Sequence, residues 1–150
     1  MELPQALRYN YLFRGLSDAH LDAVIALTSQ KSFHGGDTIL RQFGRDNDLM
    51  VVLKGAAVIK TFSGDALIEI GPGMVLGEVS LIDTEPRSAT VVAKGDCLVA
   101  VIPAEAIQNL MRHNLEVRCV LMENLAKVLC ARLRTANVQL DGAMASTTAR

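Results

Sequence analysis

Residues 49–73, LMVVLKGAAVIKTFSGDALIEIGPG, decide the fold class of this chain. Three short runs of apolar or alternating residues are separated by the glycine-containing breaks LKG, FSGD and GPG. Short runs bounded by glycine and proline are typical of β-strands that are joined by tight turns. The stretch therefore predicts three consecutive strands, at Leu49–Leu53, Ala56–Phe62 and Ala66–Ile70.

The same pattern of short apolar runs separated by glycine-containing breaks extends on both sides, from Lys31 to about Ile102. It contains the further breaks HGGD, QFGRDND and KGD, and the further runs Thr38–Arg41, Thr90–Ala93 and Cys97–Ile102. Because no long helical pattern separates these runs, they favour antiparallel pairing over a parallel sheet with crossover helices. We expect a mainly β fold over residues 31–102, an antiparallel β-barrel or jelly roll of eight strands.

Helical patterns flank this region. Residues 16–29, LSDAHLDAVIALTS, place apolar side chains at helical spacing, and Ser17 suits the N-cap position. After the barrel, Pro103 suits the start of one helix and Asn114 the cap of a longer one, which predicts a C-terminal helical pair over residues 103–140. We expect a single domain at 1–140, followed by a small, polar and disordered tail at 141–150.

The long C-terminal helix carries two apolar strips. One strip repeats at alternating steps of four and three residues, as in a coiled coil, and the other is rotated away from it. If one strip packs on the barrel, the other is covered by a second copy or by an effector domain or protein, so we expect a homodimer through residues 115–140. The alternative is a monomer that packs this helix between the barrel and the first helix. The coiled-coil strip is Leu115, Cys119, Met122, Ala126, Leu129, Leu133, Ala136 and Leu140, and the second is Val117, Val120, Leu121, Leu125 and Val128.

Composition argues against several classes of partner. The 150 residues contain 15 Lys and Arg against 16 Asp and Glu, so no broad positive field attracts nucleic acid. Tryptophan is absent and aromatic residues make up 4%, which disfavours base stacking. No uninterrupted apolar stretch approaches the roughly 20 residues that span a bilayer, and MELPQALRYN does not resemble a secretory signal. We expect no direct contact with nucleic acid and no membrane segment.

The cysteines and histidines do not suggest catalysis or metal binding. Cys97, Cys119 and Cys130 lack Cys-x-x-Cys spacing, which predicts reduced cysteines buried in the core of a cytoplasmic protein. The three histidines lie far apart in sequence, so we expect no metal site. The chain contains neither a Gly-x-Ser-x-Gly elbow nor spacing that would support a triad, and we expect no enzyme activity.

Residues 77–91, GEVSLIDTEPRSATV, place one acid and one base in a small and apolar segment. A buried carboxylate or guanidinium is costly unless it has a partner, so Glu78 and Arg87 either pair with each other or contact a ligand. The start of the VSLI helix at Val79 offers free backbone N–H groups, and Ser88 and Ala89 are small enough for their amides to approach an anion. An arginine fork fits two phosphate oxygens, and a carboxylate beside it suits hydroxyl donors such as those of a ribose.

These residues carry a resemblance to a known family. Residues 71–93, GPGMVLGEVSLIDTEPRSATVVA, resemble the phosphate-binding cassette of the cyclic nucleotide-binding domain family, and GDTILRQFGRDNDLMVVLKGAAVI at 36–59 is similar to the early barrel of that family. The resemblance implies a sensor that binds a cyclic nucleotide without making or breaking a bond. It implies that Glu78 accepts a hydrogen bond from the ribose 2′-hydroxyl and that Arg87 neutralises the cyclic phosphate.

The resemblance also implies a phosphate cradle formed by the amides of Gly77, Ser88 and Ala89. Where the family often has aromatic residues, this chain has Val75 and Leu76, which leaves the shape of the base pocket open. Serine after the arginine occurs in cAMP-preferring bacterial members, so we expect cAMP over cGMP, with movement of the C-terminal helix as the signal. No separate cofactor is expected. The alternative is a structural or protein-interaction module of the same fold that binds no nucleotide.

Overall fold

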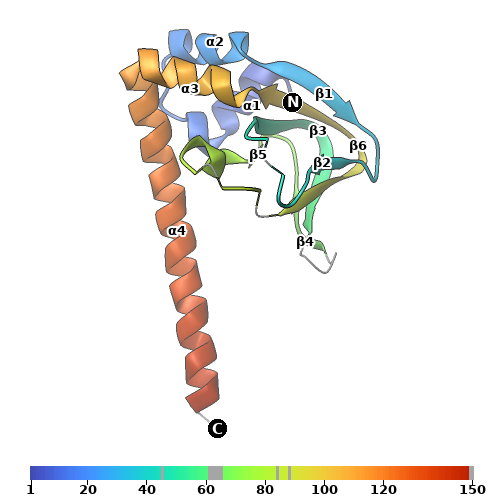
Figure 1. The fold of residues 1–150 in the computed structure, drawn as a ribbon, viewed down its shortest axis with the longest axis vertical. Helices are drawn as coiled ribbons and strands as arrows, with labels where there is room; N and C mark the ends of the chain where they lie inside the picture. Colours follow the sequence, from blue (N-terminus) through green and yellow to red (C-terminus); the bar gives the residue numbers. More distant parts are fainter. Residues whose placement is uncertain (45, 61–65, 84, 88, 149–150) are drawn as a thin grey trace.

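The computed structural model describes residues 1–44, 46–60, 66–83, 85–87 and 89–148 (Figure 1). Helices lie at both ends of the chain and the strands lie between them. In order, the elements are α1 Leu3–Tyr9, the 3-10 helix η1 Tyr11–Phe13, α2 Asp18–Ala26, β1 Ser29–Phe33, β2 Thr38–Leu40, β3 Leu49–Lys60, β4 Ala66–Ile70, β5 Val75–Leu76, the 3-10 helix η2 Glu78–Leu81, β6 Thr90–Ile102, α3 Ala104–His113 and α4 Leu115–Thr148.

All the strands join one antiparallel sheet. β1, β6, β3 and β4 are neighbours in that order, while β2 pairs with β6 and β5 pairs with β3. The predicted fold class, antiparallel β-structure with an N-terminal helix and a C-terminal helical pair, is confirmed. The described residues form six strands, however, where eight were expected.

Two glycines explain the difference in strand number. Gly55 and Gly95 were interpreted as turns, but they lie inside the long strands β3 and β6 with φ angles of 80° and 71°. The pairing of β3 with β6 shifts register around Gly55, and a Cβ at Gly55 would collide with the carbonyl oxygen of Asp96. A glycine with positive φ in a paired strand forms a bulge that bends the strand without ending it.

The core has two parts, one on each face of β3. Leu49, Val51 and Leu53 pack under the helices, and Met50 and Val52 point into the interior of the curved sheet. Successive side chains of a strand point to opposite faces, so a strand that is apolar at every position is buried on both. β3 thereby joins the helical cluster to the strand cluster that surrounds the site.

The N-terminal segment contains more structure than the sequence predicted. The helix predicted at 16–29 spans Asp18–Ala26, and the Ser17 side chain accepts a hydrogen bond from the His20 amide, which confirms the cap. α1 and η1 were not predicted. They are fixed by the buried side chain of Asn10, which donates to the Gly73 carbonyl (2.9 Å) and accepts from the Leu12 amide (2.8 Å). This long-range contact attaches the N-terminus to the turn between β4 and β5.

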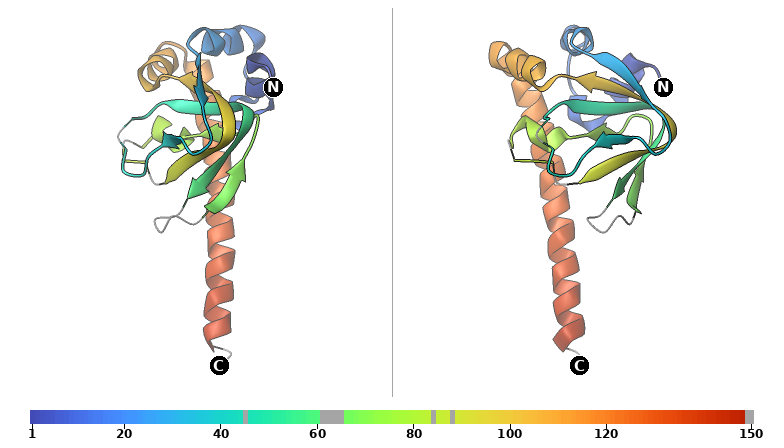
Figure 2. Two further views of the ribbon diagram at one scale, coloured as in Figure 1. Left: turned by 90° about the vertical axis from the view of Figure 1, so that its right-hand side faces the viewer. Right: turned by 45° about the vertical axis from the view of Figure 1, so that its right-hand side comes forward.

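The last helix, α4, is one long rod that projects beyond the sheet (Figure 2). Asn114 caps it as predicted, accepting from the Val117 amide at 3.1 Å. The prediction of a disordered tail at 141–150 was wrong for residues 141–148, because α4 continues to Thr148. The sequence QLDGAMAS lacks a proline, and a single glycine costs a helix only about 1 kcal/mol relative to alanine. No helix within the described ranges has the length and apolar character needed to cross a membrane.

The two apolar strips of α4 have different environments. Val117, Leu121 and Leu125 of the second strip are buried against η1, α3 and the helical core. In the coiled-coil strip, Met122 and Leu129 pack partly against the helical core, whereas Leu133 and Leu140 further along α4 are 63% and 59% exposed. One apolar face of α4 is therefore left uncovered within the described chain.

The prediction for the cysteines is corrected in part. Cys97 of β6 is buried as expected, whereas Cys119 and Cys130 are exposed on α4. All three are free thiols, and burial raises the pKa of the Cys97 thiol.

Candidate ligand-binding site

The site is formed where β5 leads into η2. Gly77 lies between them with a φ angle of 79°, a left-handed conformation that side chains disfavour. A Cβ on Gly77 would collide with Nη1 of Arg87, and it would lie 3.1 Å from the Asp48 carbonyl oxygen. Glycine is therefore required here for its conformation and because the Arg87 guanidinium packs directly on its backbone.

Arg87 is buried and held by several elements. Its Nη2 donates to the Asp48 carbonyl oxygen at 2.6 Å and to the Asp46 carboxylate at 3.2 Å, and its Nη1 donates to the Ser80 hydroxyl at 3.1 Å. The backbone is fixed as well, because the Arg87 amide donates to the Gly44 carbonyl at 2.9 Å. These contacts orient the guanidinium, and its buried Nε makes no hydrogen bond to any described group.

Glu78 is the other charged residue of the site, and its partner comes from α4. The Glu78 side chain is 8% exposed, and its Oε1 accepts a hydrogen bond from Nη2 of Arg132 at 2.6 Å. Arg132 itself is 58% exposed. The pair spans 54 residues of sequence and connects the start of η2 directly to α4. The Glu78 carboxylate also lies beside the Tyr11 hydroxyl, whose pKa is raised by burial and by the negative charge of Glu78.

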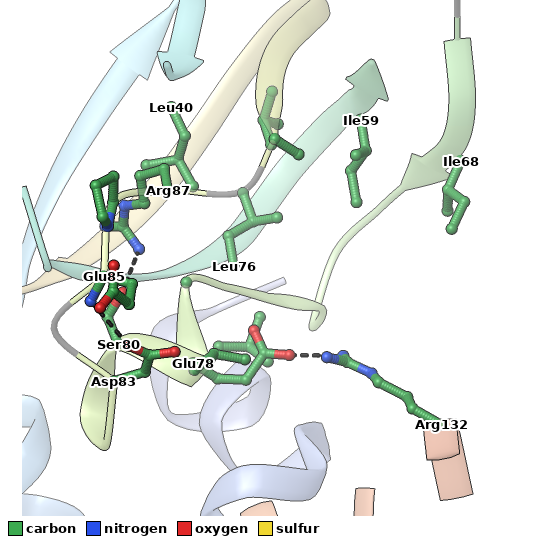
Figure 3. A pocket seen from close by; sticks show the side chains of 16 residues that line it. Leu40, Ile59, Ile68, Leu76, Glu78, Ser80, Asp83, Glu85, Arg87 and Arg132 are labelled. Atoms are coloured by element: carbon green, nitrogen blue, oxygen red, sulfur yellow. Dashed lines mark hydrogen bonds and ion pairs between the residues drawn. The ribbon is translucent and has the colours of Figure 1, made fainter. Parts of the chain in front are cut away.

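Glu78 and Arg87 do not pair with each other, although both line one cavity of about 490 Å³ (Figure 3). Ser80, Asp83 and Glu85 add polar groups near Arg87. The opposite wall is apolar and comes from four strands, with Leu40 of β2, Ile59 of β3, Ile68 of β4 and Val91 of β6. The cavity thus has a polar end built on residues 77–87 and an apolar end built on the sheet.

The structure brings nearly all the predicted site residues to this cavity. Its lining includes Gly77, Glu78, Val79, Arg87, Ala89, Val75 and Leu76, while Ser88 lies outside the described residues. Sequence reasoning missed the apolar wall, because strand residues distant in sequence carry no local signal. Sequence reasoning also missed the pairing of Arg132 of α4 with Glu78, because no local signal connects two residues so far apart in the chain.

The site has the chemistry of a receptor for a small polar molecule. A guanidinium beside a left-handed glycine and the start of a short helix can bind an anion. A carboxylate has about four acceptor positions, so the buried Glu78 carboxylate can still accept a hydrogen bond from a ligand hydroxyl group. Within the described ranges, no group of three His, Cys, Asp or Glu side chains is placed to hold a metal ion.

Comparison with known proteins identifies the family. The profile of the cyclic nucleotide-binding domain matches residues 30–114, which include the sheet, the cavity residues up to Val91, and α3. The chain belongs to the cyclic nucleotide-binding domain family.

Three relatives show how widely the domain occurs. The cyclic AMP receptor protein of Thermus thermophilus is 31% identical over 87% of this chain and 60% of its own length. Glutaminase 2 of Bradyrhizobium diazoefficiens is 28% identical over 87% of this chain but only 21% of its own length. The crystal structure of the N-terminal domain of a Streptomyces coelicolor transcriptional regulator is 28% identical, with a TM-score of 0.75, covering 90% of this chain and 94% of that one. The chain thus spans 60% of the length of the Thermus protein and 21% of the length of the glutaminase.

Proposed function

We propose that this chain is a sensor that binds a cyclic nucleoside monophosphate in the cavity between Glu78 and Arg87. The observation that carries the proposal is the separation of these two buried charges, which face one cavity and are each held by other partners. Arg87 would bind the cyclic phosphate together with the amides of Gly77 and Ala89. The Glu78 carboxylate would accept from the ribose 2′-hydroxyl, and the base would lie toward the apolar wall.

Between the two common cyclic nucleotides we favour cAMP over cGMP. The name of the Thermus relative, which is similar over 87% of this chain, specifies cyclic AMP, and this supports the choice. Ser88 follows the arginine as it does in cAMP-preferring bacterial members of the family, although a serine there is also able to contact a guanine.

The signal we propose is movement of α4. The Arg132–Glu78 ion pair supports this, because one carboxylate would contact the ribose through one oxygen and α4 through the other. A ligand that orders Glu78 would strengthen its contact with Arg132, and by linkage the helix contact would strengthen ligand binding by the same factor. The expected observation is slower amide hydrogen exchange around residues 126–136 when cAMP is bound.

A second copy of the chain is the partner we propose for the uncovered strip of α4. Leu133 and Leu140 continue the coiled-coil spacing and are 63% and 59% exposed, on the part of α4 that projects beyond the sheet (Figure 2). An effector domain or protein is the other partner that fits this strip. We also propose that the protein acts in the cytoplasm and that it performs no catalysis of its own, in keeping with its free cysteines and its sensor-type site.

The test of nucleotide binding is calorimetric titration of cAMP and cGMP into the wild type and Arg87→Ala. Losing a charge-assisted contact to phosphate is expected to weaken binding by at least tenfold, or about 1.4 kcal/mol. Arg134→Gln is the matched control, because it removes an exposed arginine of α4 that does not line the cavity. If neither nucleotide binds the wild type, the alternative holds, and the chain is an interaction module of the same fold.

A further inference from the structure

The N-terminal segment reaches the carboxylate end of the proposed nucleotide pocket through one side chain, Tyr11 of η1. Tyr11 lines a neighbouring cavity, and Glu78 and Arg132 line both that cavity and the nucleotide pocket. The Tyr11 hydroxyl is shielded from solvent and lies beside the Glu78 carboxylate, and within the described ranges it makes no hydrogen bond to any other group. Glu78 is therefore flanked by a residue of η1 as well as by one of α4.

Long-range hydrogen bonds fix the short segment that carries Tyr11. On one side of it, the buried Asn10 side chain donates to the Gly73 carbonyl oxygen at 2.9 Å. On the other side, the Asn124 side chain of α4 donates to two backbone carbonyl oxygens that follow Tyr11, each at 2.8 Å. Because both flanks are attached to the rest of the domain, the Tyr11 ring enters the cavity from a fixed backbone.

The Tyr11 hydroxyl acts as a hydrogen-bond donor toward Glu78. Burial raises the pKa of Tyr11, and the negative charge of Glu78 raises it further, against a smaller lowering by Arg132. The hydroxyl therefore stays protonated at neutral pH, and an ionised carboxylate can only accept from it. Tyrosine has only two side-chain torsions, whereas Arg132 is long and 58% exposed, so Tyr11 is the more rigid of the two neighbours.

We propose that Tyr11 is a positioning residue, which holds the Glu78 carboxylate in the orientation that accepts from the ribose 2′-hydroxyl. The role rests on the proposed function, because it concerns the same pocket. A carboxylate has about four acceptor positions, and contacts with Arg132 and Tyr11 fix the direction of those that remain. An acceptor that is already oriented loses less freedom when the ligand binds. Tyr11 thus favours ribose over deoxyribose without touching the nucleotide.

The test is calorimetric titration of cAMP and cGMP, each beside its 2′-deoxy counterpart, into the wild type, Tyr11→Phe and Tyr9→Phe. Tyr11→Phe removes only the hydroxyl. We expect it to bind the ribonucleotide at least fivefold more weakly than the wild type does, and the 2′-deoxynucleotide within twofold, because the latter has no hydroxyl for Glu78 to contact. Tyr9→Phe is the matched control. It removes the hydroxyl of an exposed tyrosine and should bind both nucleotides like the wild type.

NMR of the ligand-free protein tests the contact between Tyr11 and Glu78 apart from nucleotide binding. The chain contains two tyrosines, Tyr9 and Tyr11, so carbon-13 labelling at Cζ gives two signals, which the two phenylalanine variants assign. In Glu78→Gln the Tyr11 signal should move, because its charged neighbour is gone, while the Tyr9 signal should stay in place. An unmoved Tyr11 signal would refute the contact itself.

The titrations distinguish a wrong role for Tyr11 from a wrong proposed function. If the wild type binds neither cAMP nor cGMP, the proposed function is wrong and the role of Tyr11 falls with it. If the wild type binds one of them, the role is wrong when Tyr11→Phe binds it like the wild type. It is equally wrong when Tyr11→Phe weakens the ribonucleotide and its 2′-deoxy counterpart by the same factor, since Tyr11 then only supports the fold.

Discussion

The contact between Arg132 and Glu78 leads to the sharpest prediction about the proposed nucleotide pocket. In Arg132→Gln the buried carboxylate of Glu78 loses its cationic partner, while the rest of the cavity lining is unchanged. Without that partner the carboxylate is free to rotate, which weakens its hydrogen bond to a ribose hydroxyl. We expect cAMP affinity and folding stability to fall together.

The size of the effect follows from the geometry of the pair. Two unit charges about 4 Å apart interact by about 4 kcal/mol at an effective dielectric constant of about 20, while fully exposed pairs contribute roughly 0 to 1 kcal/mol. The 2.6 Å contact joins one partner that is 8% exposed and one that is 58% exposed, so it lies between these limits. About 1.5 kcal/mol, a usual value for a hydrogen bond to a charged group, corresponds to roughly tenfold in affinity.

The assay is calorimetric titration of cAMP, with thermal unfolding of the same samples. Arg134→Gln is the matched control and should bind cAMP within twofold of the wild type. A double-mutant cycle with Glu78→Gln isolates the pair, because the effect of Arg132→Gln should largely disappear when Glu78 is already neutral. If Arg132→Gln binds cAMP like the wild type while Glu78→Gln is severely impaired, the carboxylate does not need the helix, and the proposed link between ligand and α4 is wrong.

Three further predictions address the site, the uncovered strip and the thiols. Gly77→Ala should lower cAMP affinity at least tenfold and the free energy of unfolding by more than about 1 kcal/mol, because the methyl group collides with Arg87 in a left-handed backbone; titration and denaturant unfolding measure both. Leu133→Glu should convert a dimer to a monomer in sedimentation equilibrium, and an unchanged mass would exclude pairing through this strip. In the native protein Cys130 should react rapidly with a thiol reagent and Cys97 only on unfolding, since Cys97 is buried and its pKa is raised; equal rates would contradict the burial described.

Much of the fold could be predicted because its signals are local. Short apolar runs between glycines predicted the sheet, and helical spacing with caps at Ser17 and Asn114 predicted the flanking helices. Glycine was the ambiguous signal. Gly36 and Gly73 lie in turns as expected, whereas Gly55 and Gly95 bend strands, because a positive φ fits a turn and a bulge equally well.

In the candidate site, too, the residues that could be predicted are those with a local signal in the sequence. Glu78 and Arg87 stood out in the sequence because a short apolar segment seldom carries both an acid and a base. Their partners did not stand out, since Asp46 and Arg132 lie 41 and 54 residues away and look like ordinary surface charges. Asn10, which attaches the N-terminus to the sheet, belongs to a segment in which no structure was predicted at all.

The sequence by itself determined the class of fold, the family resemblance and the segment that forms the polar end of the cavity, because each depends on residues that are close along the chain. Only the tertiary structure decided which charges pair, which part of α4 is buried and how the N-terminal segment packs against the sheet. Those outcomes depend on which distant surfaces meet when the sheet curves and the helices pack. A charge pair such as Arg132–Glu78 exists only once the chain has closed a loop of 54 residues.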